Sequence, residues 1–109
     1  MIIRTEKIKN YTKIDNKYLE DKNISLKAKG LLTLMLSLPD SWKFNVNGLR
    51  LLCKESRYAI TNTLKELEDN RYLIIEKGHS TDGKFLYTYT IFKEQYTQKG
   101  HLVLPYMDN

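Results

Sequence analysis

Residues 45–70 read NVNGLRLLCKESRYAITNTLKELEDN and contain two short amphipathic patterns that meet at a tight corner. Asn45 has the side chain of a helix N-cap, and it precedes a helix predicted over residues 46–54. The inner face of this helix is expected to carry Val46, Leu49 and Cys53, with Leu52 flanking it. This placement makes Cys53 a core residue rather than a reactive one.

Ser56 is the expected N-cap of a second helix, predicted over residues 57–70. Its inner face follows the spacing i, i+4, i+7 and consists of Ile60, Leu64 and Leu67. Residues 55–56 alone separate the two helices, which is too short for an antiparallel hairpin loop. Two short helices with complementary apolar faces and so tight a corner predict a helix-turn-helix.

A β-hairpin is predicted directly after the second helix. Residues 72–77 (YLIIEK) and residues 85–92 (FLYTYTIF) are rich in β-branched and aromatic side chains. Between them, Asp82-Gly83 is the strongest element of a turn over residues 81–84. We therefore expect two antiparallel strands joined by this turn.

Upstream of the quoted stretch, residues 11–14 alternate like a short strand, and Asp15 or Asn16 is expected to cap a helical turn that ends near residue 21. Ser25 should cap the clearest helix, over residues 26–38, which Pro39 ends. One face of this helix carries Ala28, Leu31, Met35 and Leu38, and a second carries Leu32 and Leu36. A helix that is apolar on two faces is either central in a small core or also part of an interface. Gly30 is interpreted as a close helix contact.

The expected element order is β-α-α-α-β-β, which describes an α+β winged helix-turn-helix with a three-helix core and a hairpin wing. A length of 109 residues fits one domain. We expect a basic N-terminal arm over residues 1–10, the winged helix over 11–92, and a tail or the start of a linker over 93–109. The predicted core is formed by Leu31, Leu34, Met35, Leu38, Leu49, Ile60, Leu64, Leu67 and Leu73.

Composition narrows the class of protein. The longest nearly apolar run, residues 31–38, is too short to span a bilayer, and the charged N-terminus lacks the apolar core of a signal peptide. A single cysteine excludes an intrachain disulfide and a cysteine-built zinc site. His79 and His101 lie too far apart for a short metal motif, and no catalytic constellation or phosphate-binding glycine loop is present. We expect a cytoplasmic protein that is not an enzyme, with no metal or cofactor.

The net charge of +5 favours a polyanionic partner, but its location matters more than its sum. Residues 1–30 carry eight Lys and Arg against four Asp and Glu, whereas residues 31–70 carry five against five. A prediction of nucleic-acid binding therefore has to name the specific surface that makes the contact.

Several of these stretches resemble a known group of proteins. Residues 11–42 (YTKIDNKYLEDKNISLKAKGLLTLMLSLPDSW), 51–55 (LLCKE) and 64–69 (LKELED), with Asp82-Gly83, resemble winged-helix domains of phages and plasmids of Gram-positive bacteria. The resemblance implies a replication initiator or replisome organiser, in which a second domain follows. A standalone winged helix of this kind would be a transcriptional regulator or an accessory factor of conjugative transfer. Each of these implied roles makes double-stranded DNA the expected partner, at an origin or operator.

In such a domain the second helix of the motif enters the major groove of DNA. The outward residues would read or hold DNA: Ser56, Arg57, Tyr58, Thr61, Asn62 and Lys65. Asn62 suits an adenine edge, Lys65 suits guanine or a phosphate, and Ser56 opens a helix N-terminus suited to a phosphate. Three acidic residues should limit insertion of the helix end: Glu66, Glu68 and Asp69.

The wing should contact phosphates or the minor groove through Lys77, His79, Ser80, Thr81, Gly83 and Lys84. The arm residues Arg4, Lys7, Lys9 and Lys13 form a weaker candidate contact with the backbone. Asp82 at the tip weakens the case for the wing.

Three questions stay open at the level of sequence. Tyr87 and Tyr89 alternate on one strand face, which suits either single-strand stacking or, more commonly, packing under the wing. A homodimer is expected, with the helix over residues 26–38 and the apolar segment 101–106 as candidate surfaces. The alternative to DNA binding is a protein-interaction winged helix that uses the hairpin and the Leu32/Leu36 face, with replication or transfer proteins as partners.

Overall fold

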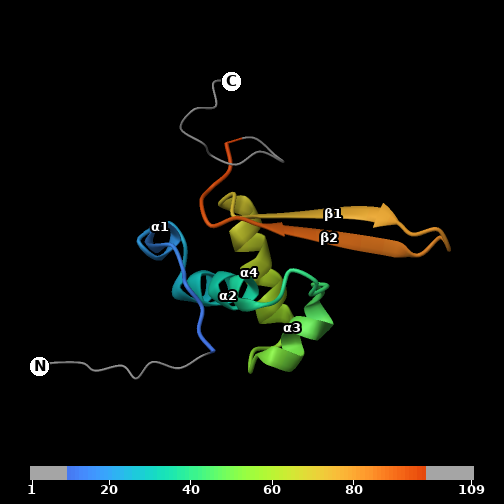
Figure 1. Cartoon of the computed structure of the whole chain (residues 1–109), viewed down its shortest axis with the longest axis horizontal. Helices are drawn as coiled ribbons and strands as arrows, with labels where there is room; N and C mark the ends of the chain where they lie inside the picture. Colours follow the sequence, from blue (N-terminus) through green and yellow to red (C-terminus); the bar gives the residue numbers. More distant parts are fainter. Residues whose placement is uncertain (1–9, 98–109) are drawn as a thin grey trace, which may run out of the picture.

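The computed structural model describes residues 10–97. Four helices precede two strands: α1 (Asn16–Leu19), α2 (Leu26–Ser37), α3 (Val46–Leu52), α4 (Arg57–Asp69), β1 (Leu73–His79) and β2 (Phe85–Ile91). The two strands are antiparallel, with Leu73 opposite Ile91 and His79 opposite Phe85. The helices form one body, and the hairpin projects from it (Figure 1). The expected α+β class, with an antiparallel hairpin after the helices, is confirmed.

The strand predicted over residues 11–14 is wrong. These residues have no regular structure, and within residues 10–97 the sheet contains β1 and β2 alone. Residue Asp15 is extended, with φ −84° and ψ 137°, because it caps α1 and not because it pairs with a strand. The alternation instead reflects partial burial of Ile14 against the core. The observed order is therefore α-α-α-α-β-β.

Each helix begins at the predicted cap. The side chains of Asp15, Ser25, Asn45 and Ser56 accept hydrogen bonds from backbone amides two or three residues ahead, at 2.8, 3.1, 2.7 and 3.2 Å respectively. The predicted C-terminal ends are one or two residues too long, since Leu38, Cys53 and Asn70 are C-caps. Local side-chain chemistry thus sets where the helices start.

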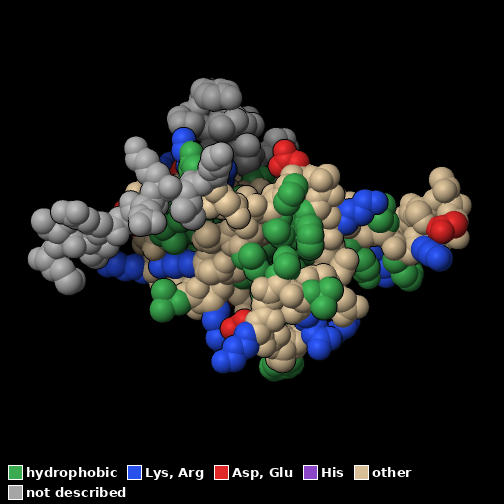
Figure 2. All heavy atoms as spheres, turned by 60° about the horizontal axis from the view of Figure 1, so that its bottom comes forward, with side chains coloured by type: hydrophobic (Ala, Val, Ile, Leu, Met, Phe, Trp, Pro, Cys, Tyr) green, Lys and Arg blue, Asp and Glu red, His purple; other side chains and the backbone are tan. Residues whose placement is uncertain are grey.

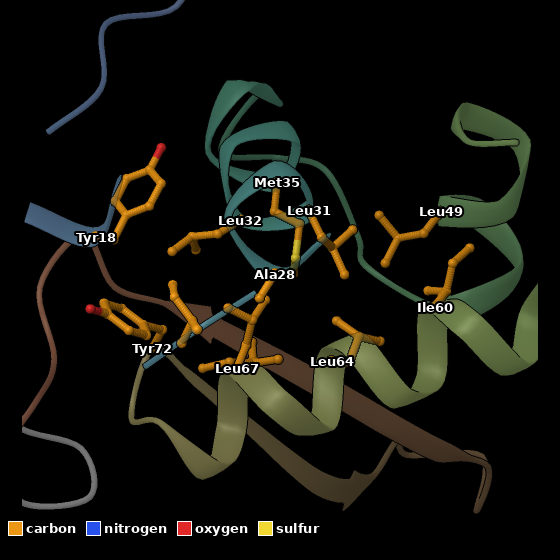
Figure 3. Close-up of a cluster of buried hydrophobic side chains, with 12 residues drawn as sticks. Tyr18, Ala28, Leu31, Leu32, Met35, Leu49, Ile60, Leu64, Leu67 and Tyr72 are labelled. Carbon is orange, nitrogen blue, oxygen red and sulfur yellow. The ribbon is translucent and has the colours of Figure 1, made fainter. Parts of the chain in front are cut away.

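The core lies where α2 and α3 meet α4 and the base of the hairpin (Figure 3). Its buried members are Tyr18, Ile24, Ala28, Leu31, Leu32, Met35, Leu49, Ile60, Leu64, Leu67, Tyr72 and Leu73. Seven of the nine predicted core residues are among them, whereas Leu34 and Leu38 are half-buried. Tyr18 from α1 is fully buried, and its hydroxyl lies 2.7 Å from Thr33 Oγ1.

Two expectations about α2 are corrected. Leu32 is fully buried and Leu36 packs against the core, so this face of α2 is part of the domain interior and does not present Leu32 to a partner. A Cβ built at Gly30 would meet no atom within 4 Å, so this glycine does not allow a close helix contact. The burial of Leu32 follows from the packing of α2 against α4 and β2, whereas Gly30 lies on the exposed side of the same helix.

Candidate nucleic-acid interface

The face of α4 opposite the core is polar and open to solvent. Because Ile60, Thr63, Leu64 and Leu67 are buried, the positions on the other side of the helix turn outward. All the predicted helix contacts are exposed there, namely Ser56, Arg57, Tyr58, Thr61, Asn62 and Lys65. Tyr58 is the most prominent, with 77% of its surface accessible. The structure therefore brings Tyr58, Thr61, Asn62 and Lys65 onto one helix face, as the spacing predicts, with Ser56 and Arg57 at the N-terminal end of the helix.

Arg57 is held at the corner between α3 and α4. Its Nη1 donates to Oδ1 of Asn47 on α3 at 2.7 Å. The Ser56 hydroxyl accepts from the Ala59 amide and so acts as the cap. The positive charge of Arg57 and the helix dipole thus coincide at the start of α4, an arrangement that favours an anion.

The acidic end of α4 is less repulsive than expected. The Glu66 carboxylate reaches back to the start of α2, where it accepts from the amide and the hydroxyl of Ser25 at 2.6 and 2.7 Å. Asp69 lies 3.8 Å from Lys65 in an exposed ion pair. Glu66 and Asp69 therefore interact with protein groups, and the Glu66 charge is compensated by the N-terminus of α2.

Lys27 was missed by sequence reasoning. It lines an open depression of about 610 Å³ between the start of α2 and α4, whose wall also includes Tyr58 and Asn62. Lys27 is exposed. Its position 30 residues before the predicted readers carries no local signal, because only the packing of α2 on α4 brings it there.

One face of the hairpin carries Lys77 and His79 beside an aromatic ring. Nζ of Lys77 lies 3.7 Å from the centroid of the Phe85 ring, and the His79 ring centroid lies 5.0 Å from the same centroid. Lys77 and His79 are both exposed. The pairing register explains this grouping, since His79 is opposite Phe85 and Lys77 is opposite Tyr87.

The hairpin tip is a tight turn whose acidic side chain is used internally. The Asp82 carboxylate accepts from the Ser80 hydroxyl and from the Lys84 amide, and these two bonds, in that order, lower the pKa of Asp82. Gly83 has φ +83°, which glycine adopts without strain. Thr81 and Lys84 are exposed and Ser80 is half-buried. The predicted wing residues thus form one projecting tip.

On the face of the molecule that Figure 2 shows, basic side chains are spread rather than gathered in one patch. Figure 2 shows them along the lower edge of the molecule and on the hairpin, with an acidic side chain near the tip. From their junction, α4 and the hairpin diverge, with α3 in the angle between them (Figure 1). Of the predicted arm residues, Lys13 is exposed, whereas Arg4, Lys7 and Lys9 lie outside the described residues.

The two candidate tyrosines of β2 have different environments. Tyr89 is half-buried, its ring centroid is 5.7 Å from that of Phe44, and burial is the main reason that the pKa of its phenol is raised. Tyr87 is 51% exposed, and Phe85 beyond it is 58% exposed. Tyr89 therefore packs under the hairpin, whereas the exposed aromatic pair consists of Phe85 and Tyr87. The two tyrosines share one face, as predicted, and the favoured packing role holds for Tyr89 but not for Tyr87.

Other sites have weaker features. Cys53 is half-buried against the core, and burial raises the pKa of its thiol. Within residues 10–97, no three His, Cys, Asp or Glu side chains are grouped to hold a metal ion, and no helix is long and apolar enough to cross a membrane. His101 lies outside the described residues.

The arrangement thus combines a polar helix face, an arginine at the corner between α3 and α4, and a projecting hairpin whose Lys77 and Lys84 are balanced in charge by Glu76 and Asp82. Comparisons with protein-family models, curated proteins and solved structures find no match to this chain.

Proposed function

We propose that this chain is a winged helix-turn-helix protein that binds double-stranded DNA, with α4 as the recognition helix and the β1–β2 hairpin as the wing. The observation that carries the proposal is the outward face of α4, where six polar side chains are exposed directly after a short helix and a tight corner. A major groove admits one α-helix, and the N-terminal part of the recognition helix makes the base contacts.

In this binding mode each exposed group has a distinct task. Asn62 accepts from and donates to an adenine edge, and Lys65 contacts guanine or a phosphate. Arg57 and the start of α4 hold a phosphate and set the register of the helix in the groove. On the hairpin, Lys77 and Lys84 contact the backbone, and the turn over residues 80–83 reaches toward the minor groove.

The biological setting is proposed from the resemblance alone. It favours a protein of a plasmid or phage that recognises an origin or operator in replication or conjugative transfer, with transcriptional regulation as the alternative. The proposal includes no enzymatic activity and no cofactor, a cytoplasmic location, and a homodimer, because one such domain covers a single half-site.

Duplexes selected by the wild-type chain from a random 24-base-pair pool provide the test, with affinity measured by fluorescence anisotropy. Asn62→Ala should weaken the free energy of DNA binding by about 1–3 kcal/mol and relax the sequence preference at one base position. Lys84→Ala should weaken binding to all duplexes alike and reduce the slope of log affinity against log salt concentration by about one. Lys93→Ala, an exposed lysine beyond β2, is the matched control.

Two results would overturn the proposal. The first is unchanged affinity and preference when Thr61, Asn62 and Lys65 are all replaced by alanine. The second is binding that does not weaken between 50 and 200 mM salt, since contacts with several phosphates lose affinity steeply over this range. The first outcome would favour a mode in which the hairpin dominates DNA binding through Lys77 and Lys84, and the second would favour the protein-interaction alternative.

A further inference from the structure

One face of the projecting hairpin is aromatic and basic over its outer half. Antiparallel partners share a face, so Lys77 lies with Tyr87 and His79 lies with Phe85. These four side chains are exposed, in contrast to Ile75 and Tyr89 nearer the base, which pack against the core. Figure 2 shows hydrophobic and basic side chains together on this projection.

The opposite face of the same strands provides an internal comparison. It carries Glu76, Gly78 and Thr88, with Leu86 as its exposed apolar side chain. Leu86 and Tyr87 are both 51% exposed, so exposure alone does not distinguish the two faces. What distinguishes them is chemistry, since one face combines the Phe85 and Tyr87 rings with the Lys77 ammonium and the His79 imidazole, and the other combines one aliphatic side chain with a carboxylate.

We propose that the face formed by Lys77, His79, Phe85 and Tyr87 binds successive unpaired bases of single-stranded DNA. Aromatic rings on a sheet stack with bases, and cations beside the rings meet the phosphates. Charge complementarity favours this occupant, because the face carries no acidic residue and the nearby Asp82 carboxylate is bonded within the turn.

The spacing of the two rings fits nucleotides whose bases are not stacked on each other. Residues i and i+2 of an antiparallel strand are about 7 Å apart, whereas a stacked strand advances about 3.4 Å per nucleotide. Bases on Phe85 and Tyr87 would therefore be separated from each other and supported by protein rings instead. The activity is distinct from duplex binding by α4 and does not depend on it.

The Lys77 ammonium now lies over the Phe85 ring, 3.7 Å from its centroid. An exposed cation–π contact is worth about two- to fivefold in an equilibrium constant, and stacking of a base on an aromatic ring is worth about 5- to 150-fold. A base should therefore displace the ammonium from the ring, and the flexible lysine stem lets it turn to the adjacent phosphate.

Binding of fluorescein-labelled dodecathymidylate to the full chain, measured by anisotropy at 50 mM salt, tests the proposal. Phe85→Ala and Tyr87→Ala should each weaken binding by about fivefold or more, and the double variant by more than either. Leu86→Ala, equally exposed on the opposite face, should change it by less than twofold. An oligomer of the same length without bases should bind weakly and respond equally little to all of these changes.

Four outcomes would overturn the proposal. The first is wild-type protein that does not bind the oligonucleotide, and the second is a Leu86→Ala variant that weakens binding as much as Tyr87→Ala does. The third is a base-free oligomer that binds as tightly as the oligonucleotide, and the fourth is loss of a dimer in the Phe85→Ala and Tyr87→Ala variants while oligonucleotide binding stays intact. The last would make the face a protein interface. The variant with alanine at Thr61, Asn62 and Lys65 should retain single-strand binding, which separates this proposal from duplex recognition by α4.

Discussion

Arg71 has an unusual backbone conformation at the end of α4. Its φ is 66°, in the left-handed region, and it is the one non-glycine residue with positive φ within residues 10–97. The amide of Tyr72 bonds the carbonyl of Leu67 at 2.9 Å, and the amide of Arg71 bonds that of Glu68 at 3.1 Å. These two bonds form a Schellman motif, whose left-handed position usually carries glycine.

We predict that Arg71→Gly is more stable than Arg71→Ala by about 1 kcal/mol. Both variants lose the bond from the Arg71 guanidinium to the carbonyl of Tyr96, so their difference isolates the strain at the backbone. Urea unfolding of the two variants measures the effect. Equal midpoints would show that the left-handed conformation carries no strain here.

Asp21 and Tyr72 form a hydrogen-bonded pair that links the end of α1 to the start of the hairpin. The Tyr72 hydroxyl donates to Oδ2 of Asp21 at 2.7 Å, and the amide of Asn23 donates to Oδ1 at 2.9 Å. These bonds, in that order, lower the pKa of Asp21, while burial is the main cause that raises the pKa of Tyr72.

The Asp21 pair predicts acid sensitivity. Because the carboxyl pKa is lower in the folded state, the unfolded chain binds the proton first, and stability rises with pH in this range. The contribution is complete above the unfolded pKa of about 3.9 and is lost as the pH falls through the lowered value. Urea midpoints from pH 6 to pH 2 should fall less for Asp21→Asn than for wild type. Asp40→Asn, at an exposed carboxylate in the connector, should follow the wild type.

At the scale of elements, Ser25 and Glu66 join α2 to α4. The Ser25 hydroxyl accepts from the Ala28 amide and donates to Glu66, while the Glu66 carboxylate also accepts from the Ser25 amide. This arrangement has the reciprocity of a capping box, but its acidic member comes from another helix, 41 residues along the chain. It fixes the start of α2 against the C-terminal part of the proposed recognition helix.

We predict that Ser25→Ala and Glu66→Ala each destabilise the fold by about 1 kcal/mol. Because the two side chains act through one network, the double variant should lose less than the sum of the single losses. A double-mutant cycle from urea unfolding measures this coupling. Strict additivity would mean that the two residues act independently.

At the scale of the whole molecule, α4 connects every layer of the core. It contacts α2, α3 and β1, and its buried side chains lie opposite those of α2 (Figure 3). Leu64 is 3% exposed at the centre of this contact, whereas Leu51 on α3 is 87% exposed. The same substitution at these two positions therefore compares a core site with a surface site in helices of one small domain.

Leu64→Ala should destabilise the protein by about 2–5 kcal/mol, from lost apolar burial and the cavity left behind. Leu51→Ala should stay within about 0.5 kcal/mol of wild type. Thermal and urea unfolding measure both changes. A melting temperature that barely moves for Leu64→Ala would contradict the placement of α4 in the core.

Much of the secondary structure was predictable because its causes are local. The four N-caps bond amides two or three residues away, the inner face of α4 follows the helical period, and Asp82-Gly83 forms the hairpin turn. For the same reason, the outward face of α4 could be named residue by residue. Each of these features depends on neighbours within about one turn of chain.

Other features were decided by tertiary structure. Residues 11–14 alternate like a strand but have no strand to pair with, and Leu32 is buried because α2 lies between other elements. Glu66 turns from the proposed DNA face toward Ser25, whose amide is brought near only by helix packing. Tyr87 and Tyr89 share one alternating pattern, and only the point at which the hairpin leaves the body makes one exposed and the other packed. Such outcomes depend on contacts between distant segments, which periodicity and local propensity do not encode.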